Sequence, residues 1–154
     1  MTAVIQIIMG FLGSLGFGIL FNVRGKRLVA ASLGGLVSWA LFLLLKIFIG
    51  EDAVCYFIVS VALSFYCEIM ARIQKTPTTT FLITTLIPLI PGSGLYYTMT
   101  KAFSGEYDSF LERGVTTLSL AVALALGVIV TTVIVSLISR IRLRAETKNK
   151  GAEK

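Results

Sequence analysis

Two prolines and two glycines interrupt a long apolar segment near the middle of the chain. Pro88, Pro91, Gly92 and Gly94 lie within seven positions of each other, in the stretch TTLIPLIPGSGLYYTM. Each proline removes a backbone donor and clashes with the preceding turn, and glycine adopts backbone angles that other residues resist. A helix in lipid can break in this way only where protein or water satisfies the freed backbone groups. The motif therefore predicts a broken helix that lines a polar pathway.

The residues after this break have the chemistry to bind an anion. We expect a second half-helix to begin near Ser93, where free N–H groups and the positive end of the helix dipole favour a carboxylate. The hydroxyl group of Ser93 can add a hydrogen bond, and Tyr96 and Tyr97 can contact a solute or lie at the outer membrane interface. Broken helices bind solutes and ions near the midplane of secondary transporters. The alternative interpretation is a simple proline kink.

A second candidate site combines one acidic and one basic residue. Glu68 and Arg72 lie four positions apart with the acid first, which is the favourable order for an ion pair on a helix. Glu68 is the only acidic residue inside an expected span. A carboxylate costs about 2.5–3.5 kcal/mol at the bilayer centre on insertion scales. Two interpretations stay open: an ion pair near the headgroups, or a carboxylate that couples transport to protons or to the substrate.

The segment FNVRGKR follows the first apolar run and ends it. Asn22 is a suitable residue to terminate a helix. Arg24, Lys26 and Arg27 fit a cytoplasmic turn that anchors the topology. The alternative is a cationic vestibule for an anionic solute.

The composition excludes most catalytic and metal chemistry. The chain has no histidine, which removes histidine-based triads, HExxH zinc sites and imidazole proton relays. Ser93 lies between two glycines, as a protease nucleophile can, but it has no base to take its proton. There is also no sign of an ATP-binding loop. We therefore expect no enzyme activity, no metal and no cofactor.

These candidate residues require a helical membrane protein to position them. Apolar residues make up 56% of the 154 residues, charged residues only 14%, and the mean hydropathy is +0.89. Uncharged apolar runs of about 18 or more residues are typical of membrane spans. The sequence predicts an all-α integral membrane protein with five transmembrane helices, the fourth broken at the proline–glycine motif. The expected spans are 3–21, 28–49, 53–73, 78–99 and 115–138, in a single domain over 1–138 that is followed by a basic cytoplasmic tail over 139–154.

Loop charges predict the orientation of these spans. One side of the membrane would carry eleven basic residues, and the positive-inside rule places that side in the cytoplasm. They are Arg24, Lys26, Arg27, Arg72, Lys75, Arg140, Arg142, Arg144, Lys148, Lys150 and Lys154. The amino terminus is then outside and the carboxyl terminus inside, which requires an odd number of spans. Because the basic residues lie beside spans, the net charge of +6 does not indicate nucleic acid.

Small residues recur at every fourth position of the first two spans. They are Gly10, Ser14 and Gly18 in the first span, and Ala30, Gly34 and Ser38 in the second. Small side chains let helix backbones approach closely in lipid. These stripes predict static helix packing, and the alternative is an interface that moves between two bundles.

Three segments of the chain resemble the threonine/serine exporter family. They are GFGILFNVRGKRL, EIMARIQKTP and, above all, LIPLIPGSGLYYTM. The chain is similar in size and hydropathy to the short subunit found where that transporter is split into two polypeptides. The resemblance implies export of small amino acids such as threonine and serine, or of small dicarboxylates such as succinate, together with a longer membrane subunit. By motif match it carries over Asn22, Pro88, Pro91, Gly92 and, loosely, Tyr97.

The sequence as a whole predicts one subunit of a secondary exporter in the bacterial plasma (inner) membrane. We expect alternating access around the broken fourth segment, driven by an ion gradient such as that of protons, for a small carboxylate-bearing solute. The longer subunit or self-association as a homo-oligomer would complete the pathway. The alternative is a non-transporting membrane subunit that stabilises or orients another protein.

Overall fold

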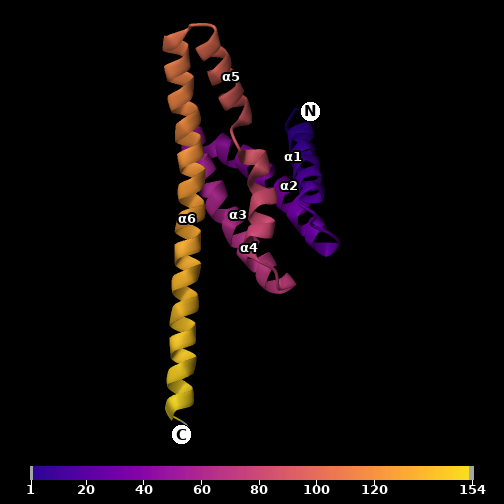
Figure 1. Cartoon of the computed structure of the whole chain (residues 1–154), viewed down its shortest axis with the longest axis vertical. Helices are drawn as coiled ribbons and strands as arrows, with labels where there is room; N and C mark the ends of the chain where they lie inside the picture. Colours follow the sequence, from indigo (N-terminus) through magenta and orange to yellow (C-terminus); the bar gives the residue numbers. More distant parts are fainter. Residues whose placement is uncertain (1, 153–154) are drawn as a thin grey trace.

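The computed structural model describes the backbone of residues 2–152 and the side chains of residues 2–141. Within this range all regular secondary structure is helical, as the sequence predicts, and short loops connect the helices (Figure 1). The helices are α1 (Thr2–Leu20), α2 (Lys26–Ile49), α3 (Asp52–Gln74), α4 (Thr78–Leu86), α5 (Gly92–Phe103) and α6 (Tyr107–Ala152), with a short 3₁₀ turn η1 (Ile87–Leu89) between α4 and α5. Four of the helices described are long and apolar enough to cross a membrane, and five spans result when the bent α4–α5 pair counts as one.

Local sequence signals end α1 and α3 in the same way. Asn22 adopts a left-handed conformation with φ 59°, and the next N–H group, of Val23, donates to the carbonyl oxygen of Gly18 at 2.9 Å. This is a Schellman motif, so the expectation that Asn22 terminates the first helix is confirmed. Lys75 has φ 49° and ends α3 with the equivalent bond.

Small residues bring α1 and α2 into close contact. The predicted positions Gly10, Ser14 and Gly18 are the buried residues of α1. Gly35 of α2 lies directly against this stripe, because a Cβ atom added there would collide with the side chain of Ser14 and the carbonyl oxygen of Gly10. Gly34 faces the other way, toward Thr85 of α4. The close helix packing that the stripes predict is therefore present, with Gly35 and not Gly34 at the contact with α1, and whether this interface moves stays a prediction.

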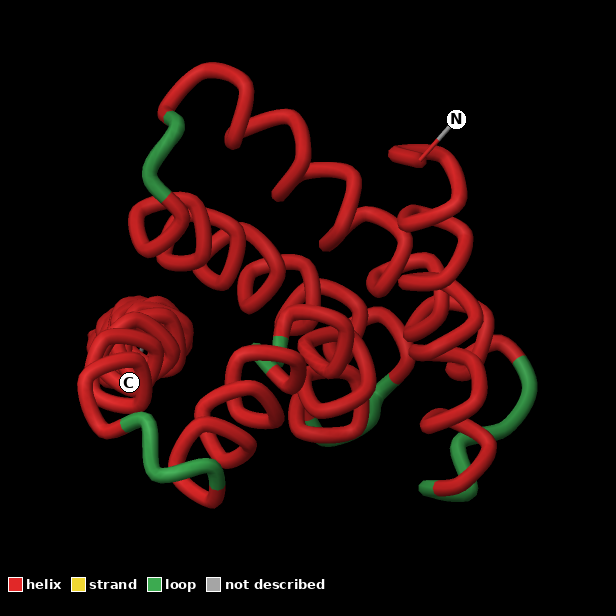
Figure 2. The backbone as a smooth tube through the Cα atoms, turned by 90° about the horizontal axis from the view of Figure 1, so that it is seen from above, coloured by secondary structure: helices red, strands yellow, loops and turns green. Residues whose placement is uncertain are grey.

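The apolar core lies between α2, α3, α4 and α6. Its fully shielded side chains include Cys55, Val59, Leu63 and Leu89. The outward faces of α1 and α6 carry exposed apolar side chains along their length, as helices that face lipid do. Figure 2 shows α6 almost end-on at the edge of the bundle. The fold therefore has a packed interior and an apolar outer surface suited to a bilayer.

The helix α6 is longer than the fifth predicted span at both ends. It begins at Tyr107, eight residues before the expected boundary, and its backbone remains helical to Ala152 with no break at 138–139. The side chains of five counted basic residues, Arg142, Arg144, Lys148, Lys150 and Lys154, lie outside the described residues. The early start has a physical reason: the spans were predicted from apolar runs, and the charged first turns of α6 interrupt such a run without interrupting the helix.

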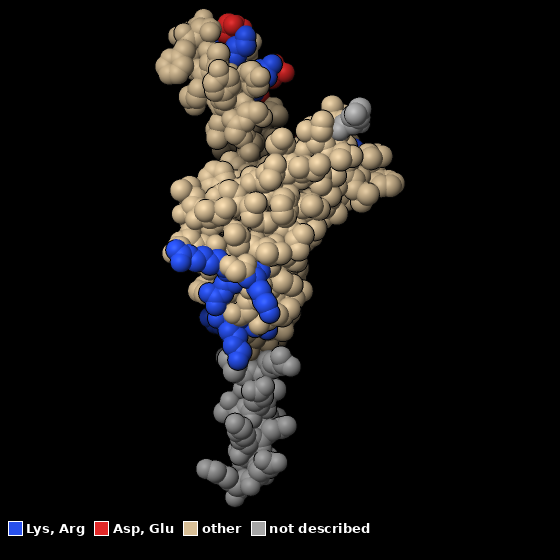
Figure 3. Space-filling view, turned by 90° about the vertical axis from the view of Figure 1, so that its right-hand side faces the viewer, with Lys and Arg blue, Asp and Glu red and all other residues tan. Residues whose placement is uncertain are grey.

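Charge is divided between the two ends of the bundle. Lys and Arg side chains gather where the loops at 21–25 and 75–77 lie, and the visible acidic side chains gather at the opposite tip (Figure 3). That tip is formed by α5, the first turns of α6 and the turn between them (Figure 1). This tip also carries Lys101 and Arg113. The larger number of Lys and Arg residues at the other end is the pattern on which the positive-inside rule acts. The α5–α6 tip is called the acidic end below, and the other end the basic end.

Candidate functional site

The proline–glycine motif breaks the fourth segment as predicted. The α4–η1 part and α5 meet at an angle of 55°, and α5 begins at Gly92, one residue before the expected position. Pro91 immediately precedes α5 with φ −74° and ψ 58°, which leaves the helical region. A helix and its continuation therefore point in different directions within one apolar segment (Figure 1).

The two glycines of the motif do not use the backbone freedom that the sequence analysis expected. Gly92 and Gly94 both lie inside α5, and neither is among the positive-φ glycines of the described chain. Gly94 is instead a point of close approach, because a Cβ atom there would lie only 2.6 Å from the Oγ1 atom of Thr117 on α6. A Cβ atom at Gly92 would meet nothing within 4 Å. The expectation was wrong because the break occurs at Pro91, before the helix that contains both glycines.

The first turn of α5 presents backbone N–H groups that are not used within the described structure. The N–H group of Leu95 donates to the Pro91 carbonyl oxygen at 3.0 Å, and that of Gly92 donates to Ile90 at 2.7 Å. The N–H groups of Ser93 and Gly94 have no backbone acceptor among the described residues, and no side chain caps the helix. Such groups at a helix N-terminus favour an anion.

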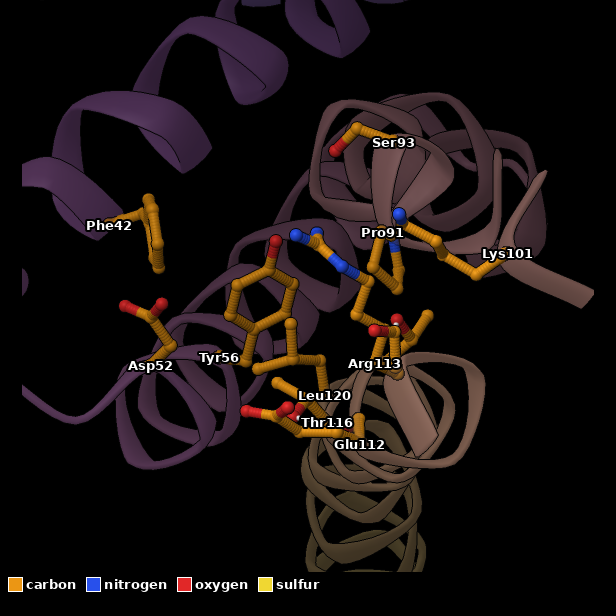
Figure 4. Close-up of a pocket in the computed structure, with 13 residues that line it drawn as sticks. Phe42, Asp52, Tyr56, Pro91, Ser93, Lys101, Glu112, Arg113, Thr116 and Leu120 are labelled. Carbon is orange, nitrogen blue, oxygen red and sulfur yellow. Dashed lines mark hydrogen bonds between the residues drawn. The ribbon is translucent and has the colours of Figure 1, made fainter. Parts of the chain in front are cut away.

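A polar cavity of about 550 Å³ lies at this break, toward the acidic end. It is bounded by the beginning of α3, the beginning of α5 and the first turns of α6 (Figure 4). Three residues predicted from the motif, Pro91, Ser93 and Gly94, line it. The other lining residues are Phe42, Asp52, Tyr56, Lys101, Ser109, Glu112, Arg113, Thr116, Thr117 and Leu120.

Two of the four charged lining residues have ion-pair partners. Asp52 lies 2.9 Å from Lys46 Nζ, and Lys101 lies 2.6 Å from a carboxylate oxygen of Glu106. Glu112 and Arg113 form no ion pair with any residue whose side chain is described. The cavity therefore has one basic and one acidic side chain, both exposed, that form no ion pair among the described side chains.

Tyr97 positions the unpaired cation. The guanidinium carbon of Arg113 lies 5.8 Å from the centre of the Tyr97 ring, a cation–π contact worth about 0.5–1 kcal/mol at an exposed site. Figure 4 shows Arg113 extending from α6 into the cavity toward the hydroxyl end of Tyr56, with Ser93 on another wall. The predicted contribution of Tyr97 is thus indirect in this geometry, because the ring contacts Arg113 and is not itself among the lining residues.

The comparison with known families places this cavity in context. Residues 6–134 match the family described as Threonine/Serine exporter, ThrE. The chain belongs to this family. No curated protein and no solved structure matches the chain. The matched range contains every residue that lines the cavity, and membership, together with the apolar helices, indicates a multi-pass membrane protein with exporter-type transport.

Two of the residues singled out by resemblance to the Threonine/Serine exporter family lie away from the main cavity. Pro88 lines a smaller hollow of about 230 Å³ beside Gly10 and Trp39. Asn22 is exposed beyond the end of α1, where its Oδ1 atom accepts a hydrogen bond from Arg24 at 2.8 Å. The structure therefore does not bring Asn22 and Pro88 together with Ser93.

Glu68 and Arg72 form a separate polar cluster near the basic end. Arg72 Nε lies 3.9 Å from Glu68 Oε2, and Thr78 donates a hydrogen bond to Glu68 Oε1 at 3.0 Å. Arg72 also donates to Ser139 Oγ on α6 at 3.2 Å. The geometry of the ion-pair interpretation is therefore present. Both residues also line a hollow of about 240 Å³, which is compatible with the second interpretation. A role of Glu68 in coupling stays a prediction.

Sequence reasoning missed the α6 side of the cavity. The expected fifth span begins at residue 115, so it left Glu112 and Arg113 outside the spans. In the structure they lie on the second turn of α6, and the hydroxyl groups of Thr116 and Thr117 donate to their carbonyl oxygens at 2.9 and 2.8 Å. The repeat of a charged pair and a threonine pair at a spacing of four residues was the available signal. It indicates one polar helix face just before the apolar run.

Proposed function

We propose that this chain is one subunit of a secondary exporter of small amino acids such as threonine and serine, and that the cavity at the broken helix is part of the solute path. The single observation that carries the proposal is a charged cavity at the helix break, inside the residues that match the exporter family. Its volume of about 550 Å³ lies within the usual range of small-molecule sites. Free N–H groups and Arg113 suit the carboxylate that every such solute carries.

The cavity lies toward the acidic end, where the proposed path would release the exported solute. Under the positive-inside rule that end faces outward, and the basic end faces the cytoplasm. The α5–α6 hairpin extends past the other helices at this end (Figure 1), and α5 packs against α6. Movement of the hairpin about Pro91 would change access to the cavity, as alternating access requires.

The proposal includes a longer partner subunit. Glu112 and Arg113 are exposed in this chain alone, and they lie on α6, a helix that is long and apolar enough to span a membrane. Charges that face lipid cost several kcal/mol, so they normally face protein or a water-filled cavity. A second chain that covers the open side of the cavity would supply this environment. The longer family subunit is the proposed occupant, and a second copy of this chain is the alternative.

Coupling to a proton gradient is part of the proposal, with Glu68 as the candidate carrier. Glu68 is an acidic residue within the last two turns of α3, and it lines a hollow that Arg72 also lines. A dicarboxylate such as succinate is the second candidate solute. The scaffold alternative is weakened because the small-residue stripe of α1 is already used within the chain, against α2.

Counterflow in proteoliposomes tests the proposal. Labelled threonine, serine and succinate would be supplied to vesicles that contain this chain alone or with the longer family subunit, under an imposed proton gradient. We expect flux of at least one amino acid when both chains are present. Flux from this chain alone would replace the partner with self-association. No flux of any of the three solutes from correctly folded protein would overturn the exporter proposal in favour of an assembly subunit.

A further inference from the structure

We propose that Glu112 and Arg113 form a charge-matched solute site, in which Arg113 binds a carboxylate and Glu112 selects for an ammonium group at the other end of the solute. The inference rests on the proposed function and deepens it, because it assigns the residues that separate zwitterionic amino acids from dicarboxylates. It is argued from the charge balance and the arrangement of the cavity.

The charge balance singles out these two residues. The other charged lining residues are already held by neighbours: Asp52 by Lys46, and Lys101 by both carboxylate oxygens of Glu106 at 2.6 and 2.7 Å. Without a solute, the described cavity therefore keeps one unpaired positive and one unpaired negative charge. A zwitterion satisfies both, whereas a dicarboxylate satisfies Arg113 and places a second negative charge near Glu112.

The arrangement of the two side chains fits a solute with two different ends. Adjacent residues on a helix point about 100° apart, so their head groups reach different parts of the cavity. Figure 4 shows Arg113 directed toward the hydroxyl end of Tyr56 and the Glu112 carboxylate on another side. The Arg113 guanidinium can bind a carboxylate through two parallel hydrogen bonds, which a point charge cannot do. Tyr97 stabilises it from outside the cavity.

Hydroxyl groups that line the cavity can receive the side chain of a small amino acid. The hydroxyl groups of Thr116 and Thr117 donate to α6 carbonyl oxygens, so their oxygen lone pairs remain available as acceptors. Ser93 contributes a further hydroxyl group from α5. A hydroxylated side chain such as that of threonine or serine would find hydrogen-bond partners here.

The alternative is that Glu112 and Arg113 only anchor the hairpin in the headgroup region. An anchoring role predicts equal effects on all solutes, whereas a selective site predicts an effect on their ratio. Asp108 provides a matched control, because it carries the same charge one turn earlier on α6 and does not line the cavity.

The test compares Glu112→Gln, Arg113→Gln and Asp108→Asn in the assembly that transports. Counterflow of labelled threonine and succinate would be measured, together with equilibrium binding of both solutes to the purified protein. We expect a wild-type preference for threonine. Glu112→Gln should lower the threonine-to-succinate ratio by roughly tenfold or more, as for loss of one hydrogen bond to a charged group. Arg113→Gln should weaken binding of both solutes, and Asp108→Asn should leave the ratio unchanged.

Several results would overturn the inference, and they can be distinguished from results that would overturn the proposed exporter function. A wild-type preference for succinate, or a Glu112→Gln variant with an unchanged ratio, would remove the selective role of Glu112. An equal shift in Asp108→Asn would show a general charge effect. Threonine binding that depends on Arg113, in a protein without flux, would retain the site and remove the exporter role. If neither threonine nor succinate binds, the proposed site is ruled out.

Discussion

The contact between Gly94 and Thr117 leads to a prediction that can be worked out from the structure. A Cβ atom at Gly94 would lie 2.6 Å from Thr117 Oγ1 and 3.1 Å from Thr117 Cγ2. Separations below about 3 Å between such atoms require the Thr117 side chain or one of the two helices to shift. Gly94→Ala should therefore push α5 away from α6 at the wall of the cavity.

The expected cost of Gly94→Ala combines two opposing terms. Insertion of extra atoms into a packed contact costs about 1–3 kcal/mol. Replacement of glycine by alanine inside a helix returns about 0.8–1 kcal/mol. A net destabilisation of roughly 0–2 kcal/mol follows, which a membrane protein can tolerate. Flux should fall even where the protein remains folded, because both residues line the proposed solute site.

Gly92→Ala is the matched control for this substitution. It adds the same methyl group two residues earlier in α5, where nothing lies within 4 Å. It should leave flux unchanged and stabilise the helix slightly. The double variant Gly94→Ala with Thr117→Ala should match the flux of the Thr117→Ala single variant, because the Oγ1 and Cγ2 atoms that collide with the new methyl group are absent from both.

The assay is initial-rate counterflow, corrected for the amount of folded protein in the membrane. Stability would be followed by titration with denaturing detergent. Equal flux in the Gly94→Ala and Gly92→Ala proteins would refute the reasoning, because only one of these residues faces another helix. A double variant whose flux falls below that of Thr117→Ala by the same factor as Gly94→Ala falls below the wild type would show that the defect does not come from the contact with Thr117.

Three further predictions concern other parts of the chain. Pro91→Ala restores a backbone donor at the break, so we expect a straighter α4–α5 segment. The variant should accumulate normally in the membrane but show reduced flux. Full flux would count against a functional break. If Glu68 carries the coupling proton, Glu68→Gln should flatten the pH dependence of flux, and an unchanged pH profile with normal flux would leave only its ion-pair role. Gly35→Ala should destabilise the protein by about 1–3 kcal/mol in detergent titration, because the new methyl group collides with Ser14. Gly13→Ala, whose methyl group would meet nothing within 4 Å, should not destabilise it. Similar unfolding midpoints for the two variants would contradict the packing of α1 on α2.

Much of the fold could be predicted from local signals. Apolar runs long enough to span a bilayer identify the helices, because lipid leaves every backbone polar group to be satisfied within the helix. Pro91 identifies the break and Asn22 the end of α1, because proline lacks a donor and asparagine tolerates the left-handed conformation. These are properties of single residues and their immediate neighbours, so no knowledge of the packing is needed.

The candidate site could be predicted only in part from such local signals. The sequence directed attention to Pro91, Ser93 and Gly94, which do line the cavity. It placed Glu112 and Arg113 in a loop, because a search for apolar runs stops at the first charged residues even where the helix continues. It also suggested backbone freedom at Gly94, which is a helical residue that provides space for Thr117.

The sequence by itself determined a helical membrane protein with a break in its fourth segment, since apolar length, proline and helix-ending residues act locally. Only the tertiary structure decided which residues share the cavity. The meeting of α3, α5 and α6 depends on how helices distant in sequence pack, and no local pattern contains that information. The same packing left Glu112 and Arg113 without ion-pair partners among the described side chains, while Asp52 and Lys101 acquired theirs from residues nearby in the chain. The difference arises because near neighbours in sequence meet whatever the fold, whereas contacts between helices exist only after the chain has folded.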